Sequence, residues 1–359
     1  MIKESIAKVI RGDNLSEADM EKTMEEVFDG RASSSQIGSF ATALRMKGET
    51  VDEITGAARA LRSRAMKLQL DNHLLNLDRD DINVEGETIL ETTDTGKEDT
   101  SIFNISTATI FVVAGGGIKV ARHGNRAASM YFGAADVLAN LGVNLDISFS
   151  DVERCIREVG IGFIFTQLSQ GPMRNVARLR EEMGIRTIFN LIGPLANPAG
   201  ASAHVLGVYE ASLTEKMAQV LLNLGAGEAF VVYGEGTLDE ISICGPTTIS
   251  RLKNGKVESF VIEPEHYGMK RADRESIKGG NARKNAQIIN DVLDGETGPR
   301  RDVVVLNAAA AFVASGMDVD LHDGIKRACE IIDSGKARKK LDELVEFTSL
   351  CRPFLRKEL

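Results

Sequence analysis

The sequence lacks the features that would place it in several specialised classes of protein. It has no apolar run long enough to cross a bilayer. Residues 1–20 carry acidic side chains and no continuous apolar core, unlike a signal or transit peptide. We therefore expect a cytoplasmic protein without a membrane partner. The cysteines show no CxxC pair and no Cys–His spacing typical of a metal site, so we expect reduced, structural thiols at Cys155, Cys244, Cys329 and Cys351.

An excess of positive charge is also missing. The chain has 43 Lys and Arg against 52 Asp and Glu, a net charge of -9, which repels the phosphate backbone of nucleic acids. We therefore expect no nucleic-acid partner. Binding of a small anionic substrate is compatible with this net charge, because a few converging cationic side chains create a local positive field in an acidic protein. With 43% hydrophobic and 26% charged residues, the composition is that of an ordinary globular protein.

Length and patterning predict two domains. A chain of 359 residues exceeds the usual size of one hydrophobic core. In the first part of the chain, apolar residues recur at helical spacing in several short segments. We therefore predict an all-helical domain over residues 1–70 and an α/β domain over residues 71–359. Two capping patterns predict helix starts in the first domain, Ser16 with Asp19 and Thr50 with Glu53.

In the second domain, β-prone runs alternate with helical patterns. This alternation is typical of an α/β fold with a mainly parallel sheet. Helical patterns cover residues 134–141 and 212–224. The predicted strands lie within residues 87–94, 116–122, 160–166, 186–193, 204–209 and 228–234.

A first candidate site lies at Asn104, Ser106 and Thr107, which precede a continuous apolar run at residues 108–114. The run reads as a buried helix that ends at Gly115–Gly117. Polar side chains at such a helix start either cap the helix or, together with its free N–H groups, bind phosphate.

A second candidate site surrounds Gly124. Arg122, His123, Asn125 and Arg126 lie here at the end of a β-prone run. Such a charged group is either solvated surface or an anion-binding site, for which guanidinium groups are well suited.

Several motifs occur together in one order along the chain. They are FNIST, RHGNR, GAADVLANLGVN, GIRTIFNLIGPLANP and LDEIS. With QIGSFATALRMKGET near the start and GMKRADRESIKGGNARKNA near the end, they resemble the anthranilate phosphoribosyltransferases over nearly the whole chain. The pyrimidine nucleoside phosphorylases are more distantly similar in fold.

The resemblance implies transfer of the 5-phosphoribosyl group from phosphoribosyl pyrophosphate to the amine of anthranilate, in tryptophan biosynthesis. It also implies Mg²⁺ as cofactor and a homodimer formed through the helical domain. The breaking bond leaves negative charge on pyrophosphate and cationic character on the ribose, so a metal and cationic or N–H clamps assist more than a nucleophile. We therefore expect binding residues but no dedicated catalytic nucleophile or base.

The resemblance also assigns residues. Asp239 and Glu240, with Ser106, would hold Mg²⁺, which prefers hard oxygen ligands. Arg180 would pair with the acceptor carboxylate, and a segment near residues 168–186 would pack on the helical domain. The remaining substrate-binding positions are Thr95, Gly96, Asn104, Ser106, Thr107, Arg122, His123, Asn125, Gly193 and Pro194.

The sequence departs from the family's motifs in three places, a loop, a residue pair and a single residue. Family members usually carry a glycine-rich GTGGDG loop before FNIST, where this chain has DTGKED at residues 94–99. Glycines let backbone N–H groups approach a pyrophosphate, and the acidic side chains would repel it unless a metal intervenes. Gln170–Gly171 stands where a His-Pro pair commonly lines the acceptor pocket, and Arg122 stands where lysine is common. These differences leave two alternatives open, a different aromatic acceptor and a non-catalytic binding protein.

Overall fold

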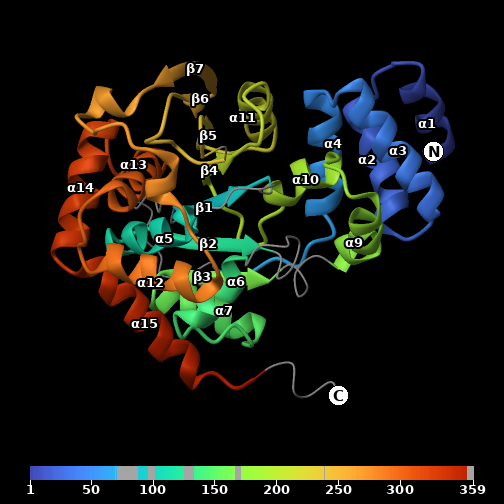
Figure 1. Ribbon diagram of the computed structural model, residues 1–359. Coiled ribbons are helices and arrows are strands. Elements are labelled where there is room, and N and C mark those ends of the chain that lie inside the picture. Colours follow the sequence, from blue (N-terminus) through green and yellow to red (C-terminus); the bar gives the residue numbers. More distant parts are fainter. Residues whose placement is uncertain are drawn as a thin grey trace, which may run out of the picture.

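The computed structural model describes residues 1–68, 70, 88–95, 102–124, 133–165, 171–237 and 239–353. These residues form a smaller lobe of helices beside a larger lobe built around a sheet (Figure 1). This arrangement confirms the predicted fold class, a small helical domain followed by a large α/β domain. No helix in these ranges is both long enough and apolar enough to span a bilayer.

The N-terminal helices of the smaller lobe begin where capping residues predict. Thr50 and Glu53 form the predicted capping box, each side chain accepting a hydrogen bond from the other residue's backbone N–H. At the other predicted start, Ser16 accepts from the N–H of Asp19, which is half of a box. These helices are α1 (Ile2–Ile10), α2 (Glu17–Phe28), α3 (Ser34–Lys47) and α4 (Val51–Arg62).

Two later helices join the smaller lobe, α9 (Gly171–Met183) and α10 (Ile188–Ile192). Met173 and Val176 of α9 and Phe189 of α10 are buried in the same apolar core as α1–α4. The Asn175 side chain also donates a hydrogen bond to the Phe28 carbonyl at 3.1 Å. The described part of the segment 168–186 therefore contacts the helical lobe.

The sheet of the larger lobe has the strand order β3-β2-β1-β4-β5-β6-β7. The five strands from β3 to β5 are parallel, and β6 and β7 are antiparallel to their neighbours. The sheet is thus mainly parallel, as predicted. The strands are β1 (Ile89–Asp94), β2 (Lys119–Gly124), β3 (Ile161–Phe165), β4 (Ala203–Gly207), β5 (Glu228–Gly234), β6 (Thr247–Lys253) and β7 (Lys256–Ile262).

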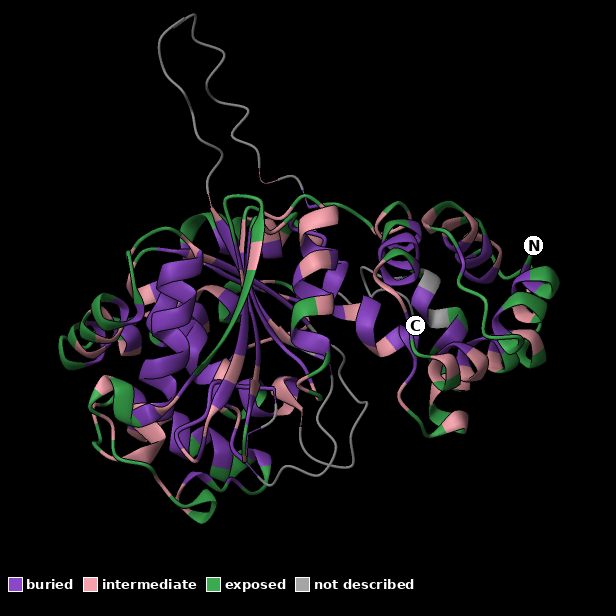
Figure 2. Ribbon diagram, turned by 90° about the horizontal axis from the view of Figure 1, so that it is seen from above, coloured by how far each residue is buried: buried purple, intermediate pink, exposed green. Residues whose placement is uncertain are grey.

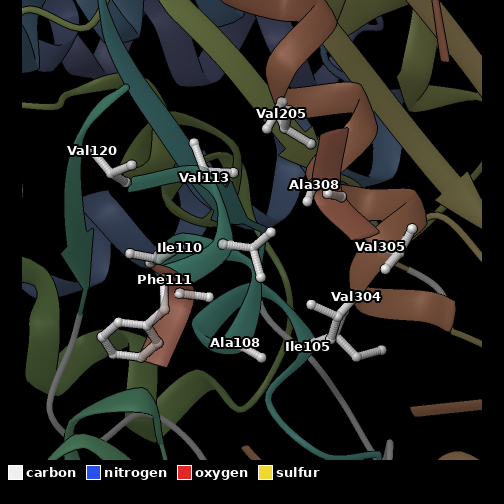
Figure 3. Packing of buried hydrophobic residues seen from close by; sticks show 14 of the residues in the cluster. Ile105, Ala108, Ile110, Phe111, Val113, Val120, Val205, Val304, Val305 and Ala308 are labelled. Carbon is white, nitrogen blue, oxygen red and sulfur yellow. The ribbon is translucent and has the colours of Figure 1, made fainter. Parts of the chain in front are cut away.

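Side-chain alternation gives the sheet two faces, each covered by helices. Val120 of β2 and Val205 of β4 point to the face covered by α5 (Ile105–Gly115) and α13 (Pro299–Ala314), in one apolar cluster with Val113 and Ala308 (Figure 3). The opposite face is covered by α7 (Phe149–Glu158) and α11 (Leu213–Asn223). Figure 2 shows that the central strands are largely buried between these layers. The remaining elements are α6 (Ala134–Asn140), η1 (Gly193–Leu195), η2 (Pro264–Tyr267), η3 (Arg274–Ile277), α12 (Ala282–Leu293), α14 (Leu321–Asp333) and α15 (Lys336–Leu350).

One predicted strand, residues 186–193, is wrong. The structure has the short helix α10 there, followed by the 3-10 turn η1. Thr187 and Asn190 form a capping box at the start of α10, and Ile188 and Phe189 are buried in the core of the helical lobe. Local capping and packing between the lobes therefore override the β-propensity of the run.

The hairpin of β6 and β7 is an element that the strand prediction missed. Its turn is Asn254–Gly255, and both residues have positive φ, 51° and 72°. Asn-Gly is the typical pair for a two-residue hairpin turn of this kind. The signal is present in the sequence, although exposed side chains on β7 weaken its apolar alternation.

Candidate active site

The carboxyl ends of the parallel strands β4 and β5 meet at one edge of the sheet, and the loop after β5 lies over this edge. Two glycines make room for it. A Cβ at Gly207 would overlap the Asp239 carbonyl, and a Cβ at Gly234 would overlap the Glu240 carbonyl. Asp239 and Glu240, called the acidic pair below, are therefore held at the strand ends, where open α/β sheets bind their ligands.

The acidic pair contacts the first turn of α5. The backbone N–H of Ser106 donates to Oε1 of Glu240 at 3.2 Å, and Nη1 of Arg122 donates to Oγ of Ser106 at 2.9 Å. Asp239, Glu240 and Arg122 are all buried. Four of the predicted site residues thus converge at a helix N-terminus, where N–H groups and the helix dipole favour anions.

The residues at this point fit a magnesium ion. Two carboxylates and a hydroxyl are hard oxygen donors, which Mg²⁺ prefers. Within the described residues, no three His, Cys, Asp or Glu side chains are arranged so that they could hold a metal ion, so the protein would supply only part of a metal shell. Mg²⁺ is commonly held in this way, with waters and substrate phosphates completing the octahedron. A cavity of about 10 Å³, room for about one water-sized atom, is lined by residues that include Thr92, Ser106, Asp239, Glu240 and Asn307.

The polar side chains at the start of α5 make contacts other than helix capping. Asn104 is the residue before the helix, but its side chain makes no capping hydrogen bond. Its Oδ1 instead accepts from Nδ2 of Asn285 at 3.0 Å. The hydroxyl groups of Thr107 and Thr95 are buried and, within the described chain, have no hydrogen-bond partner. Capping by Asn104, one of the two alternatives for this segment, is therefore wrong, and phosphate binding stays a prediction.

His123 does not converge with Arg122, because neighbouring residues of a strand point to opposite faces. Its Nδ1 contacts Oε1 of Glu91, and its Nε2 lies 2.8 Å from the carbonyl oxygen of Gly193. With both partners taken as acceptors, we assign a proton to each ring nitrogen and a charged imidazole. His123 thus links β1 to Gly193, which with Pro194 lies in η1.

The charge of His123 depends on Glu91. Burial alone would lower the pKa of His123, but the Glu91 carboxylate and the Gly193 carbonyl raise it above the ordinary value of 6.5. His204 lies on the other side of Glu91, with its Nδ1 3.8 Å from Oε2. Burial lowers the pKa of His204, so we assign it as neutral, with its Nε2–H donating to the Ala201 carbonyl at 3.0 Å.

Arg180 lies near the C-terminal end of α9, in the helical lobe, and is half-buried. Within the described residues its buried Nε has no hydrogen-bond partner, and burial lowers the pKa of its guanidinium. The charge of Glu181 opposes this effect of burial, and the guanidinium is only partly satisfied within the described residues.

Several predicted positions lie outside the described residues. They are Asn125, Gly96 and the neighbouring loop residues 97–99, together with Gln170. Thr95 is described at the end of β1, where its N–H donates to the Gly207 carbonyl at 3.1 Å. Thr95 therefore lies beside the same strand end as the acidic pair.

The two lobes match two descriptions of one glycosyl transferase family. Residues 3–65 match its helical bundle domain, and residues 86–338 match its a/b domain. The anthranilate phosphoribosyltransferase of Geotalea uraniireducens is 49% identical over 349 residues, which cover 97% of this chain and 100% of that protein. The chain belongs to the anthranilate phosphoribosyltransferase family.

Solved structures of the family have the same fold. The anthranilate phosphoribosyltransferase of Thermus thermophilus superimposes with a TM-score of 0.86 at 37% identity, covering 96% of this chain and 99% of that one. The enzyme of Saccharomyces cerevisiae, in complex with phosphoribosyl pyrophosphate and magnesium, has a TM-score of 0.83 at 25% identity, covering 97% and 98% of the two chains. The sequence resemblance to the anthranilate phosphoribosyltransferases is therefore confirmed over both lobes.

The sequence reasoning missed three buried polar residues that support the family's site in this chain. They are Glu91, Asn285 and Asn307, whose side chains contact His123, Asn104 and the loop of the acidic pair respectively. A charged or amide side chain within an apolar run is the signal that marks Glu91 and Asn307 in the sequence, because such groups are buried only with partners.

Proposed function

We propose that this protein transfers the 5-phosphoribosyl group from phosphoribosyl pyrophosphate to the amine of anthranilate, with release of pyrophosphate, as a step of tryptophan biosynthesis. The observation that carries the proposal is the convergence of Asp239, Glu240, Ser106 and Arg122 at the start of α5. The yeast relative, which has the same fold, was solved with phosphoribosyl pyrophosphate and magnesium.

In the proposed donor site, Mg²⁺ neutralises the charge that develops on pyrophosphate as the bond to the anomeric carbon breaks. Asp239 and Glu240, with the Ser106 hydroxyl, hold the metal. The guanidinium of Arg122 and the hydroxyl groups of Thr95 and Thr107 lie nearby to bind phosphate or ribose oxygens. Gly96 and Asn125 are proposed as further donor and acceptor contacts, from the resemblance alone.

In the proposed acceptor site, Arg180 pairs with the carboxylate of anthranilate. Its unsatisfied Nε supports this role. Gly193 and Pro194 form the wall of the pocket, and His123 fixes this wall by its contact with the Gly193 carbonyl. An arylamine is uncharged at neutral pH and keeps its lone pair, so positioning, without a dedicated base, is sufficient for attack.

The test is an assay of purified protein with phosphoribosyl pyrophosphate, Mg²⁺ and a panel of aromatic amines. We expect consumption of anthranilate with release of pyrophosphate. If another amine is used and anthranilate is not, the acceptor is different, an alternative that Gln170–Gly171 favours. If no amine is consumed while the donor still binds, the protein is a binding protein.

The loop at residues 94–99 is the part of the donor site that departs furthest from the family. Its acidic side chains should make donor binding unusually dependent on divalent metal. Calorimetry with phosphoribosyl pyrophosphate, with and without Mg²⁺, measures this dependence. Restoring the family pattern, by Asp94→Gly, Lys97→Gly, Glu98→Asp and Asp99→Gly together, should tighten the donor. Unchanged weak binding would show that the donor site is lost for other reasons.

We further propose a domain boundary near residue 70, a cytoplasmic location and a homodimer formed through the helical lobe. The family descriptions, which match 3–65 and 86–338, support the boundary. Ile10 of α1 and Met46 of α3 support the dimer, because these large apolar side chains are 68% and 84% exposed. Light scattering that finds only monomer at micromolar concentration would exclude the dimer.

A further inference from the structure

A buried asparagine lies in the middle of the apolar helix α13. Asn307 is 2% exposed, and its neighbours along the helix, Val303 to Ala314, are apolar and buried. A polar amide in such a place has to find partners. Its partners are on the loop that carries Asp239 and Glu240.

The Asn307 carboxamide pairs with the backbone of Ile241, the residue after the acidic pair. Its Oδ1 accepts from the Ile241 N–H at 2.9 Å, and its Nδ2 donates to the Ile241 carbonyl at 2.9 Å. Nδ2 also donates to the Val303 carbonyl at 2.8 Å, one turn back along α13. The carboxamide thus satisfies both backbone groups of Ile241, as a neighbouring strand would do within a sheet. The loop itself is not part of the sheet.

We propose that Asn307 is a positioning residue for the metal-binding pair Asp239–Glu240. The inference rests on the proposed metal site. The loop is fixed from the sheet side by close packing at Gly207 and Gly234, where side chains would overlap it. On the α13 side, Asn307 contributes hydrogen bonds that define the direction of the backbone at Ile241, and hence of the adjoining Glu240 carboxylate.

The same contact joins two elements of the site. Glu240 accepts from the Ser106 N–H of α5, and α5 packs against α13 (Figure 3). Asn307 also lines the small cavity beside the acidic pair. Loss of the carboxamide leaves the N–H and the carbonyl of Ile241 without these partners in the core, so the loop has to shift to find new ones. A shift at Ile241 displaces the carboxylate next to it.

The test is metal binding by the whole protein. Mn²⁺ replaces Mg²⁺ and is titrated in the presence of phosphoribosyl pyrophosphate, with electron paramagnetic resonance reporting the free ion. Asn307→Ala removes both hydrogen bonds between the carboxamide and the Ile241 backbone. Val313→Ala is the matched control, because it also truncates a buried side chain of α13 but lies six residues further along the helix, roughly 9 Å away. Thermal unfolding of both variants measures what is lost in packing.

We expect Asn307→Ala to weaken Mn²⁺ binding by about tenfold or more, as is typical for residues that orient metal ligands, while Val313→Ala binds Mn²⁺ as the wild type does. Faster hydrogen exchange at the Ile241 amide should accompany the loss. If Asn307→Ala does not fold, Asn307→Ser is tested by the same criteria. Equal Mn²⁺ affinity in the wild type and the Asn307 variant overturns the positioning role alone. A wild type that binds no Mn²⁺ with the donor present overturns the metal site itself.

Discussion

The contact between Glu91 and His123 offers a sharp test of how the acceptor side of the site is held. Glu91→Gln keeps the size of the side chain but removes its charge. The His123 imidazolium then has a neutral partner, and burial, which lowers its pKa, is no longer opposed by a carboxylate. The ring should therefore lose a proton at neutral pH. The neutral ring can keep its Nε2–H toward the Gly193 carbonyl and accept at Nδ1 from the new amide, so the ion pair is replaced by an uncharged hydrogen bond.

The size of the effect follows from the burial of both groups, since Glu91 and His123 are 0% and 6% exposed. Removing one partner of a buried ion pair costs about 3 to 5 kcal/mol if the other stays charged. Deprotonation limits this cost, and what is then lost is the charge-assisted hydrogen bond of the pair, about 1.5 to 3 kcal/mol. We therefore expect Glu91→Gln to lower the free energy of unfolding by about 2 to 4 kcal/mol at neutral pH.

The direction of the His123 pKa shift determines how the free energy of unfolding changes with pH. The pKa of His123 is raised in the folded protein, so its stabilising contribution is complete below the ordinary value of 6.5 and is lost as pH rises through the folded value. Urea unfolding across this range should show a larger alkaline loss of stability in the wild type than in Glu91→Gln. Glu53→Gln, at another buried carboxyl, which pairs with Lys47, is the control and should keep the wild-type slope in this pH range. A Glu91→Gln variant that loses less than about 1 kcal/mol with an unchanged pH profile would refute a charged His123.

Three further predictions concern the rest of the site. Arg180→Ala should raise the acceptor KM, because roughly 2 to 4 kcal/mol of carboxylate binding is lost, while the donor affinity measured by calorimetry stays unchanged. An equal loss of donor affinity would place Arg180 outside the acceptor pocket. Gly207→Ala should lower the free energy of unfolding by about 1 to 3 kcal/mol and weaken Mg²⁺ binding, because the new Cβ overlaps the loop of the acidic pair; calorimetric Mg²⁺ binding that matches the wild type would contradict this. Arg62→Met should raise the acceptor KM, since Arg62 holds the end of η1 at 2.5 Å; Arg59→Met, from the same helix, serves as the control, and equal effects of the two would argue against a specific role.

The fold was largely predictable because its signals are local. Apolar spacing, capping residues and the alternation of helical and β-prone runs indicated both lobes and five of the seven strands. The error at residues 186–193 arose because a β-prone run is packed between the lobes as a helix, a tertiary effect that propensity does not contain. The missed hairpin at Asn254–Gly255 did have a local signal in its turn.

The site was only partly predictable, because its partnerships cross the chain. The motifs identified Ser106, Arg122 and the acidic pair, and the structure brings them together. Other side chains that contact this region lie far away in sequence, as Asn307 does from Ile241 and Asn285 from Asn104. Such pairings depend on which helices cover which face of the sheet. Periodicity can predict that a face is buried but does not specify what lies against it.

Neighbouring residues of β2 point toward the two halves of the proposed site from opposite faces of the sheet. Arg122 points toward α5 and Ser106, whereas His123 points toward Gly193. The donor half is held by elements of the large lobe alone. The proposed acceptor half includes Arg180 on α9, a helix that places Met173 and Val176 in the apolar cluster shared with α1–α4. Because a rotation between the lobes would move Arg180 relative to Ser106 without disturbing the donor contacts, acceptor recognition should depend on the lobe arrangement and donor recognition should not.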